Sequence, residues 1–272
     1  MIDLSVYIER MLDTINANRT DGKKTAILVR TLTAQALQEE SLLLSCVRAV
    51  TASIERAGTR WSNPPLYVAE DRSVSIRIFY WPAGYGNDPH LHQAWTVTGV
   101  LHNEIVAETY RQTFLSDQAA LGPSKSFVAH AGDTGFLLPP CVHRLYNPSK
   151  VDSATWHVFA AEDRGAAVSD APKDITHNAK AMGKKSNIRD RALGVICGML
   201  ARMKVEGAVD LLSRIFVLGG PNVKLQAVKA LAVHDVKLAY LKSCELEACV
   251  EGHDRGTLSR INARLASALP TY

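Results

Sequence analysis

The chain has 272 residues, of which 47% are apolar and 21% are charged, so it can bury a core and is neither disordered nor collagen-like. No apolar run approaches the roughly 20 residues that cross a bilayer, and the amphipathic first 19 residues do not resemble a secretion signal. The five cysteines are odd in number and form no CxxC pair, which argues against a disulfide framework. We therefore expect a globular, cytoplasmic protein without a membrane partner.

Residues 1–60 have the pattern of a helical segment. Helices are predicted over 2–18 and 24–57, because apolar residues recur there with helical spacing. The turn signal RTDG precedes the second helix and Gly58 ends it. The sequence SNPP at 62–65 then breaks the pattern, so we expect the helical segment to pack on the domain that follows.

Residues 61–164 have the texture of a β-domain. Short runs rich in β-branched and aromatic residues alternate with turn sequences such as PAGYGNDP and NPSKVD. Short strands with such punctuation predict an antiparallel sandwich or barrel, so we expect a mostly β core. The runs are LYVAE, SVSIRIFYW, AWTVTGV, EIVAETYRQTF, SFVAH, TGFLLP and SATWHVFA.

A polar sequence, AEDRGAAVSDAPKD, leads from the β-domain into a helical extension over 165–272. The extension carries 16 Lys and Arg against 10 Asp and Glu, but these charges sit singly along helices. A nucleic-acid site would cluster its positive charge, so no nucleic-acid partner is expected. The extension offers a surface for a homo-oligomer. Its predicted helices are NIRDRALGVICGMLARM, GAVDLLSRIFVLGG, NVKLQAVKALAV and GTLSRINARLASAL.

Three of the nine histidines have the spacing of metal ligands. His90 and His92 lie two apart, so on a strand their side chains point the same way. His143, which follows two prolines, would add a third imidazole and leave coordination positions open. Neutral imidazole binds Fe, Zn, Cu and Ni alike, so the spacing predicts a metal site without choosing the metal.

The glycines, prolines and Asn147 around these histidines resemble the two cupin motifs. Gly84, His90 and His92 match the first motif, G–x5–HxH. The second motif is matched by Gly132, Pro139, His143 and Asn147, with Cys141 where its inner glycine usually stands. Val97 occupies the place of the usual glutamate. The resemblance implies a cupin double-stranded β-helix, an antiparallel barrel with flanking N- and C-terminal helices, and a three-histidine site that leaves a divalent ion its full charge.

Four runs within residues 66–162 resemble cysteine dioxygenase and the related thiol dioxygenases. The resemblance implies that His90, His92 and His143 hold Fe(II), and that Thr155 and His157 match a serine and a histidine beside the metal. It also implies a helical segment before the barrel. The runs are WPAGYGNDPHLH, VTGVLHNEIVAETY, VHRLYN and TWHVF.

The chain departs from that family at three positions. Val97 and Phe159 replace the cysteine and tyrosine that are sometimes cross-linked, so no thioether can form. Ala69 replaces the arginine that pairs with the substrate carboxylate, and alanine cannot make a bidentate contact. We predict that Arg72, or else Arg77, takes over this role and that Phe159 lines the substrate site.

The sequence therefore predicts a non-haem Fe(II), O2-dependent dioxygenase that acts on a small molecule, with oxidation of a thiol to a sulfinate as the leading example. His157, held by Thr155, would be the catalytic group that handles protons. Two alternatives remain open. One is a cupin iron oxygenase acting on a non-thiol metabolite, and the other is a non-enzymatic cupin that senses a metal or ligand.

Overall fold

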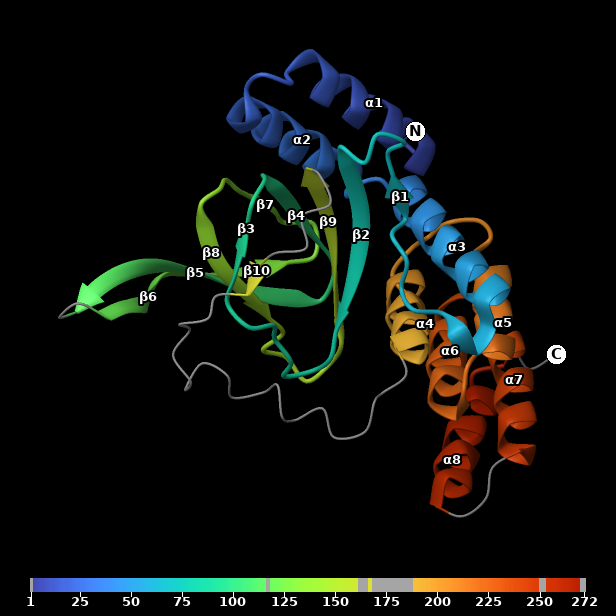
Figure 1. Ribbon diagram of the computed structural model, residues 1–272. Coiled ribbons are helices and arrows are strands. Elements are labelled where there is room, and N and C mark those ends of the chain that lie inside the picture. Colours follow the sequence, from blue (N-terminus) through green and yellow to red (C-terminus); the bar gives the residue numbers. More distant parts are fainter. Residues whose placement is uncertain (1, 116–117, 161–165, 168–187, 250–252, 270–272) are drawn as a thin grey trace. The chain divides into compact units, whose positions relative to one another are not determined.

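The computed structural model describes residues 2–115, 118–160, 166–167, 188–249 and 253–269 (Figure 1). The chain divides into two compact units. The first comprises Met1–Cys46 and Ser62–Ser186, and the second comprises Val47–Trp61 and Asn187–Tyr272. The predicted segment 1–60 thus contributes to both units.

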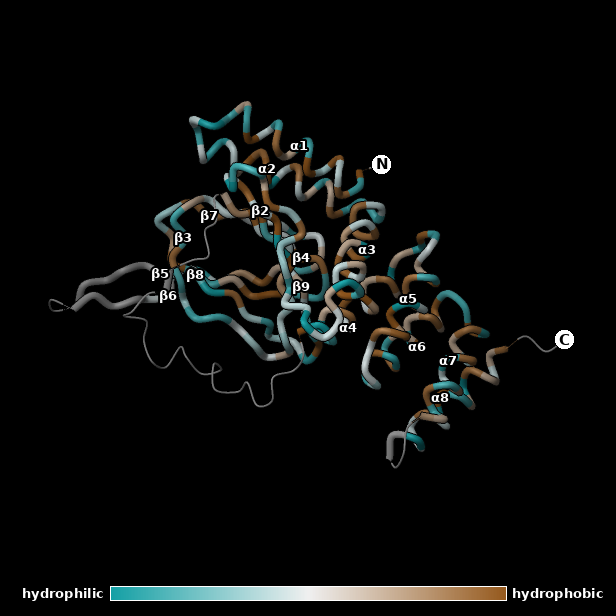
Figure 2. The backbone as a smooth tube through the Cα atoms, turned by 45° about the vertical axis from the view of Figure 1, so that its right-hand side comes forward, coloured by the Kyte–Doolittle hydropathy of each residue, from teal (hydrophilic) through white to brown (hydrophobic). Residues whose placement is uncertain are grey.

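The first unit begins with the helices α1 (Leu4–Ala17) and α2 (Gly22–Ala36) and the start of α3 (Glu40–Ala57). An aspartate caps each of the first two helices, since Asp3 accepts from Val6 N at 3.0 Å and Asp21 from Lys24 N at 2.9 Å. Figure 2 shows teal and brown alternating along both helices, as expected of amphipathic helices. The single helix predicted over 24–57 is wrong, because the chain turns at 37–39 between α2 and α3.

The predicted antiparallel β-domain is present as two five-stranded sheets. One has the order β1-β2-β9-β4-β7 and the other β10-β3-β8-β5-β6, and all described pairings are antiparallel. The first sheet contains β1 (Tyr67–Val68), β2 (Val74–Trp81), β4 (Thr96–His102), β7 (Thr134–Leu137) and β9 (Ser153–Ala160). The second contains β3 (His90–His92), β5 (Glu104–Leu115), β6 (Gln118–His130), β8 (Cys141–Tyr146) and β10 (Ala166–Ala167).

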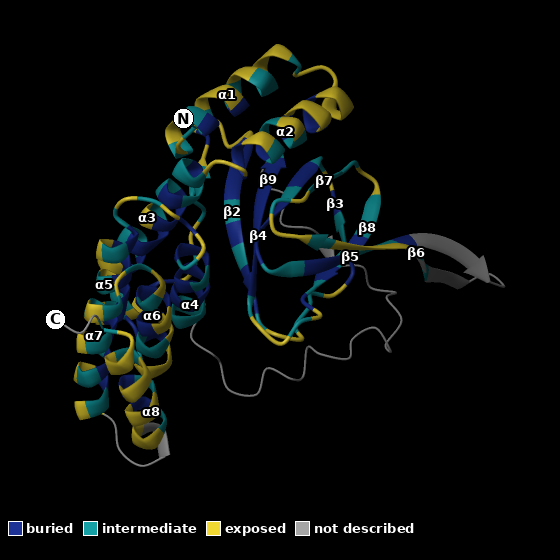
Figure 3. Ribbon diagram, turned by 180° about the vertical axis from the view of Figure 1, so that it is seen from behind, coloured by how far each residue is buried: buried dark blue, intermediate teal, exposed yellow. Residues whose placement is uncertain are grey.

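The strand β9 shows how the alternation of side chains divides the first unit. Thr155, His157 and Phe159 lie on one face of the strand, and Trp156 lies on the other. The ring of Trp156 meets Tyr7 of α1 edge-on, with the centroids 5.2 Å apart. Figure 3 shows β9 and its neighbours β2 and β4 mostly in the colour of buried residues. The first sheet is therefore covered by helix on one face and faces the interior of the barrel with the other.

The second unit is helical. It contains the C-terminal part of α3, the short 3-10 helix η1 (Gly58–Arg60) and five further helices. Arg214 and Glu55 link two of its parts through a side-chain hydrogen bond of 3.0 Å. The sequence missed the fourth of the five helices. They are α4 (Ile188–Leu200), α5 (Ala208–Leu218), α6 (Pro221–His234), α7 (Val236–Ala248) and α8 (His253–Ser267).

About half of the described residues are helical, so the description as mostly β holds for the barrel and is wrong for the molecule as a whole. Within the described ranges, the eight α-helices together contain more residues than the ten strands, of which several are short. None of the described helices has both the length and the apolar character that a membrane crossing requires.

Candidate metal centre

Two neighbouring strands carry the three histidines. In the ladder between β3 and β8, His90 lies opposite His143 and His92 lies opposite Cys141. Because residues directly opposite each other point to the same face of a sheet, the three imidazoles project together, while Leu91 between them points away. The predicted same-face arrangement of His90 and His92 is therefore confirmed, and β8 brings the third ligand beside them.

The loop before β3 fits closely against β8. A Cβ atom at Gly86 would overlap the Cβ of Tyr146 and lie 2.9 Å from the carbonyl oxygen of Leu145. Asn87 fixes the same contact through two hydrogen bonds to Leu145. Its backbone N–H donates to Leu145 O at 3.0 Å, and its side-chain Oδ1 accepts from Leu145 N at 2.7 Å. The position of β3, and with it that of two histidines, is therefore set by β8.

The Nε2 atoms of the three rings converge. His92 Nε2 lies 3.1 Å from His90 Nε2 and 2.9 Å from His143 Nε2. A neutral imidazole nitrogen is either a donor or an acceptor, so His92 Nε2 cannot complete both contacts as hydrogen bonds. Two nitrogens bound at roughly 2.1 Å to one ion, at right angles, stand about 3 Å apart. The spacing thus fits three lone pairs directed at one metal ion, and within the described part of the chain these three residues are the group that could hold such an ion.

The protonation of the rings also suits a metal. His90 Nδ1 lies 2.9 Å from the carbonyl oxygen of Asp88, so Nδ1–H donates there and Nε2 keeps its lone pair. Burial, reinforced by the neighbouring imidazoles His90 and His92, lowers the pKa of His143 to about 2. This ring is therefore neutral at physiological pH, which is the state that binds a metal.

The metal group faces a cavity of about 690 Å³ inside the first unit. Most of the wall is aromatic or apolar, and among the described lining residues there is no aspartate or glutamate. The lining residues are Ser62, Asn63, Pro64, Pro65, Arg77, Phe79, Trp81, Asn87, His90, His92, His143, Leu145, His157 and Phe159. Such a cavity can hold a small molecule beside the metal group and shield it from water.

His157 lies in the cavity wall and Thr155 stands behind it. Thr155 Oγ1 is 2.8 Å from His157 Nε2, and Thr98 Oγ1 is 3.3 Å from Nδ1 of the same ring. Burial, together with the charges that His92 and His90 would carry, lowers the pKa of His157 to about 3. The structure thus brings His157 to the cavity, and Thr155 does not line it but contacts the histidine.

The two residues predicted to bind substrate have different positions. Phe159 lines the cavity and stacks on His157, with ring centroids 5.5 Å apart. Arg72 is exposed in the turn between β1 and β2 and does not line the cavity, whereas Arg77 of β2 does. Trp81 and the segment 62–65 are lining residues that the sequence analysis missed.

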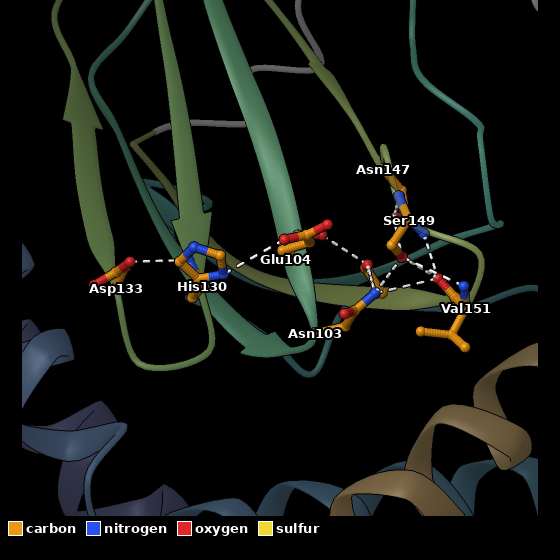
Figure 4. A network of polar contacts seen from close by, with 8 residues as sticks. Asn103, Glu104, His130, Asp133, Asn147, Ser149 and Val151 are labelled. Carbon is orange, nitrogen blue, oxygen red and sulfur yellow. Dashed lines mark hydrogen bonds and ion pairs between the residues drawn. The ribbon is translucent and has the colours of Figure 1, made fainter.

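Glu104 and Glu108, the first two acidic residues after His92 in the sequence, are engaged elsewhere. Glu108 forms an ion pair with Arg144 at 3.1 Å and lies opposite it in the ladder between β5 and β8. Arg144 is next to His143 on β8, so the two side chains point to opposite faces of the sheet. Glu104 lies 3.5 Å from His130 in the polar network of Figure 4. The expectation of a site with three histidines and no glutamate agrees with these positions.

Asn147, the last residue of the second motif, is buried and supports the barrel. Its amide donates to the carbonyl oxygens of Trp81 at 3.2 Å, Pro82 at 3.2 Å and Val151 at 2.7 Å. Its Oδ1 accepts from the amide and hydroxyl of Ser149 at 3.0 and 2.8 Å (Figure 4). Asn147 therefore fastens the turn between β8 and β9 to the end of β2, which explains an asparagine four residues after a ligand.

No family model and no curated protein matches the chain. Solved structures similar to it include an oxalate oxidase in complex with the substrate analogue glycolate, with 23% identity, coverage of 33% of this chain and 42% of that chain, and a TM-score of 0.27. A cupin superfamily protein from Desulfitobacterium hafniense is 14% identical, with 36% and 75% covered and a TM-score of 0.27. The oxalate decarboxylase of Bacillus subtilis, described with Mn(II) centres, is 13% identical. The match covers 34% of this chain and 22% of that chain, also with a TM-score of 0.27.

What the described residues themselves show is two antiparallel sheets and a group of three histidines that could hold a metal ion.

Proposed function

We propose that this protein is a non-haem Fe(II), O2-dependent dioxygenase of a small molecule, with oxidation of a thiol to a sulfinate as its leading reaction. The convergence of three imidazole Nε2 atoms at the wall of one cavity carries the proposal. An Fe(II) ion held by His90, His92 and His143 would supply the redox chemistry that allows O2 to react with a bound donor. Both atoms of O2 then go to sulfur (RS⁻ + O2 → RSO2⁻), and no other reductant is needed.

The cavity wall provides orientation and exclusion of water. Phe79, Trp81 and Phe159 surround the space beside the metal group, and a dry site protects reactive species from side reactions. Holding the donor next to the ion turns an encounter in solution into an oriented reaction. We assign these side chains to substrate positioning.

His157 is the group that holds or moves a proton in this proposal. Thr155 accepts a hydrogen bond from Trp81 Nε1 at 2.7 Å, which leaves its own hydroxyl hydrogen to donate to His157 Nε2. This arrangement favours a ring with its proton on Nδ1, 3.3 Å from Thr98 Oγ1. In this proposal the ring donates that proton to a substrate atom, or accepts the proton of a thiol at Nδ1 after giving its own away.

The test is anaerobic purification with metal analysis, followed by O2 uptake against cysteine, 3-mercaptopropionate, cysteamine and bulkier thiols. We expect one iron per chain and uptake with at least one thiol, with both lost in His143→Ala. His130→Ala is the matched control, because His130 is exposed on β6 and paired with Glu104 away from the metal group.

Two outcomes would redirect the proposal. Tight iron binding with every thiol inert would favour the oxygenase of a non-thiol metabolite. Metal binding without O2 consumption from any substrate would favour the sensing cupin.

A homo-oligomer formed through 165–272, the absence of a nucleic-acid partner and the cytoplasmic location stay predictions.

A further inference from the structure

Thr96 of β4 has a buried hydroxyl group that differs from those of the other buried threonines. The residue is 0% exposed, and its Oγ1 makes no hydrogen bond within the part of the chain that the structure describes. Each of the other buried threonines of that part has a hydrogen-bond partner for Oγ1. They are Thr25, Thr33, Thr51 and Thr155. A buried hydroxyl without a partner destabilises a fold, so the fold alone gives no reason for a threonine at this position.

The strand register places this hydroxyl on the inner face of the first sheet. Thr96 lies opposite Phe159 in the ladder between β4 and β9, and Phe159 lines the cavity. Residues opposite each other share a face of the sheet and have Cβ atoms roughly 5 Å apart. Val97, which follows Thr96, lies opposite Val158 and therefore points to the other face. Thr96, and not Val97, is thus the residue at the start of β4 that faces the inside.

Phe159 lies between Thr96 and the metal group. The centroid of its ring is 5.7 Å from that of His92 and 5.5 Å from that of His157. Thr96 also follows His92 by only four residues, so one short turn leads from a metal-binding strand to this hydroxyl. Thr96 itself does not line the cavity. A ligand in the cavity can therefore reach the hydroxyl only if the wall moves, and Phe159 is the wall residue directly opposite it.

We propose that the Thr96 hydroxyl donates a hydrogen bond to a small anion bound at the three-histidine group, and that the Phe159 ring turns aside to admit this anion. The proposal rests on the proposed function, because it needs a metal ion held by the three histidines. It adds a binding residue for a small second ligand beside the organic donor.

The charges at the site favour an anion. Imidazole ligands bring no negative charge, so a divalent ion held by three of them keeps its whole charge. The described lining residues include no aspartate or glutamate. A hydroxyl group can donate to an anion without adding a charge of its own. Since a hydrogen bond to a charged acceptor is stronger than one between neutral groups, it can offset the unfavourable burial of this hydroxyl.

The first measurement is the urea midpoint of the metal-free protein. Thr96→Val replaces the hydroxyl with a methyl group of similar size and so removes a buried polar group without a partner. We expect its midpoint to equal or exceed that of wild type. Thr33→Val is the matched control, because the Thr33 hydroxyl donates to Val29 O at 2.8 Å and contacts the Tyr7 hydroxyl at 2.7 Å. The midpoint of this control should fall.

The second measurement is the affinity for azide, a small anion, in protein loaded with Co(II), whose visible absorption changes when a ligand binds. Thr96→Val should bind azide roughly tenfold or more weakly than wild type, because a hydrogen bond to a charged ligand is lost. Thr96→Ser keeps the hydroxyl and should keep most of the affinity, and Thr33→Val should bind azide like wild type. Phe159→Leu has a smaller side chain in the wall and should bind azide faster than wild type.

Three results would overturn the proposal. The first is a Thr96→Val midpoint lowered as far as that of Thr33→Val, which would make the hydroxyl a structural group. The second is equal azide affinity in wild type and Thr96→Val. The third is azide binding to Phe159→Leu at the wild-type rate, which would refute the movement of the ring. The outcome is separable from that of the proposed function, since thiol oxidation is read from O2 uptake and azide binding needs neither O2 nor a thiol.

Discussion

The hydroxyl of Thr155 lies 2.8 Å from Nε2 of His157, and both side chains are buried. The same hydroxyl accepts the indole hydrogen of Trp81 at 2.7 Å. One oxygen atom therefore satisfies two buried polar groups, Trp81 Nε1 and His157 Nε2, and sets the orientation of the His157 imidazole.

Replacing this hydroxyl should affect both stability and catalysis. Thr155→Val keeps the shape but leaves Trp81 Nε1 and His157 Nε2 without their partner. Each buried polar atom that loses its partner costs about 1–3 kcal/mol, so the loss of two partners should lower the free energy of unfolding by roughly 2–6 kcal/mol in urea titrations. Thr155→Ser should restore most of the loss. A valine variant as stable and as active as wild type would contradict the role assigned to Thr155.

The low pKa of His157 should make the metal-free protein less stable in acid. Its pKa of about 3 in the folded state is below the ordinary value of 6.5, so below pH 6.5 the unfolded chain binds the proton more readily. The contribution of His157 to the free energy of unfolding is fully present above pH 6.5. It is lost as the pH falls toward 3, by about 1.4 kcal/mol per pH unit.

The measurement is urea unfolding of metal-free wild type and His157→Asn between about pH 5 and pH 7.5. The slope of stability against pH should be about 1.4 kcal/mol per unit shallower in the variant at the acid end. His143 contributes in the same direction, since its pKa is also lowered, so a residual slope should remain. Identical slopes for the two proteins would show that His157 is charged in the folded state.

Gly86 should be intolerant of a side chain, because a Cβ there would overlap Tyr146. Gly86→Ala should push the loop away from β8, cost about 1–3 kcal/mol as overpacking does, and weaken metal binding at least tenfold by moving β3. Gly135→Ala is the control, since Gly135 lies on β7 with nothing within 4 Å of its added Cβ. Equal metal affinities in the two variants would mean that the loop does not set the positions of the histidines.

Binding of the metal should stabilise the fold. A ligand present at 100 times its dissociation constant adds about 2.7 kcal/mol, so a divalent metal should raise the thermal midpoint of wild type by several degrees. His143→Ala should show almost no such increase, and His130→Ala should show the full one. Differential scanning fluorimetry, with and without a chelator, measures the difference.

The ligand set could be predicted from sequence because it depends on the period of a strand. His90 and His92 share a face in any strand that contains both, and the second motif supplies His143. Arg77 shows where this reasoning ends. Only the pairing of β2 with β9 places it in the cavity wall opposite His157, and the sequence analysis therefore selected the exposed Arg72 first.

The helices were missed or merged for physical reasons. The turn at 37–39 contains no glycine or proline that would mark it in the sequence. In the structure the chain turns where Leu37 packs against β4. The contact is close, because a Cβ atom at Gly99 would lie 2.5 Å from Leu37 Cδ1. The helix α7 starts where α6 ends, at Asp235, which caps both. Its buried residues include the small Ala239 and Ser243, so the apolar stripe that marks a helix is weak.

The separation of the ligands along the chain has a consequence for unfolding. His92 and His143 are 51 residues apart, and the loop between them contains β4, β5, β6 and β7. An ion bound by both would close that loop as a cross-link does, which lowers the entropy of the unfolded chain. It would also oppose a one-residue slip of β3 along β8, which would exchange the histidines for Leu91 on the inner face. The ion would then affect the rate at which the barrel unfolds as well as the reaction in its cavity.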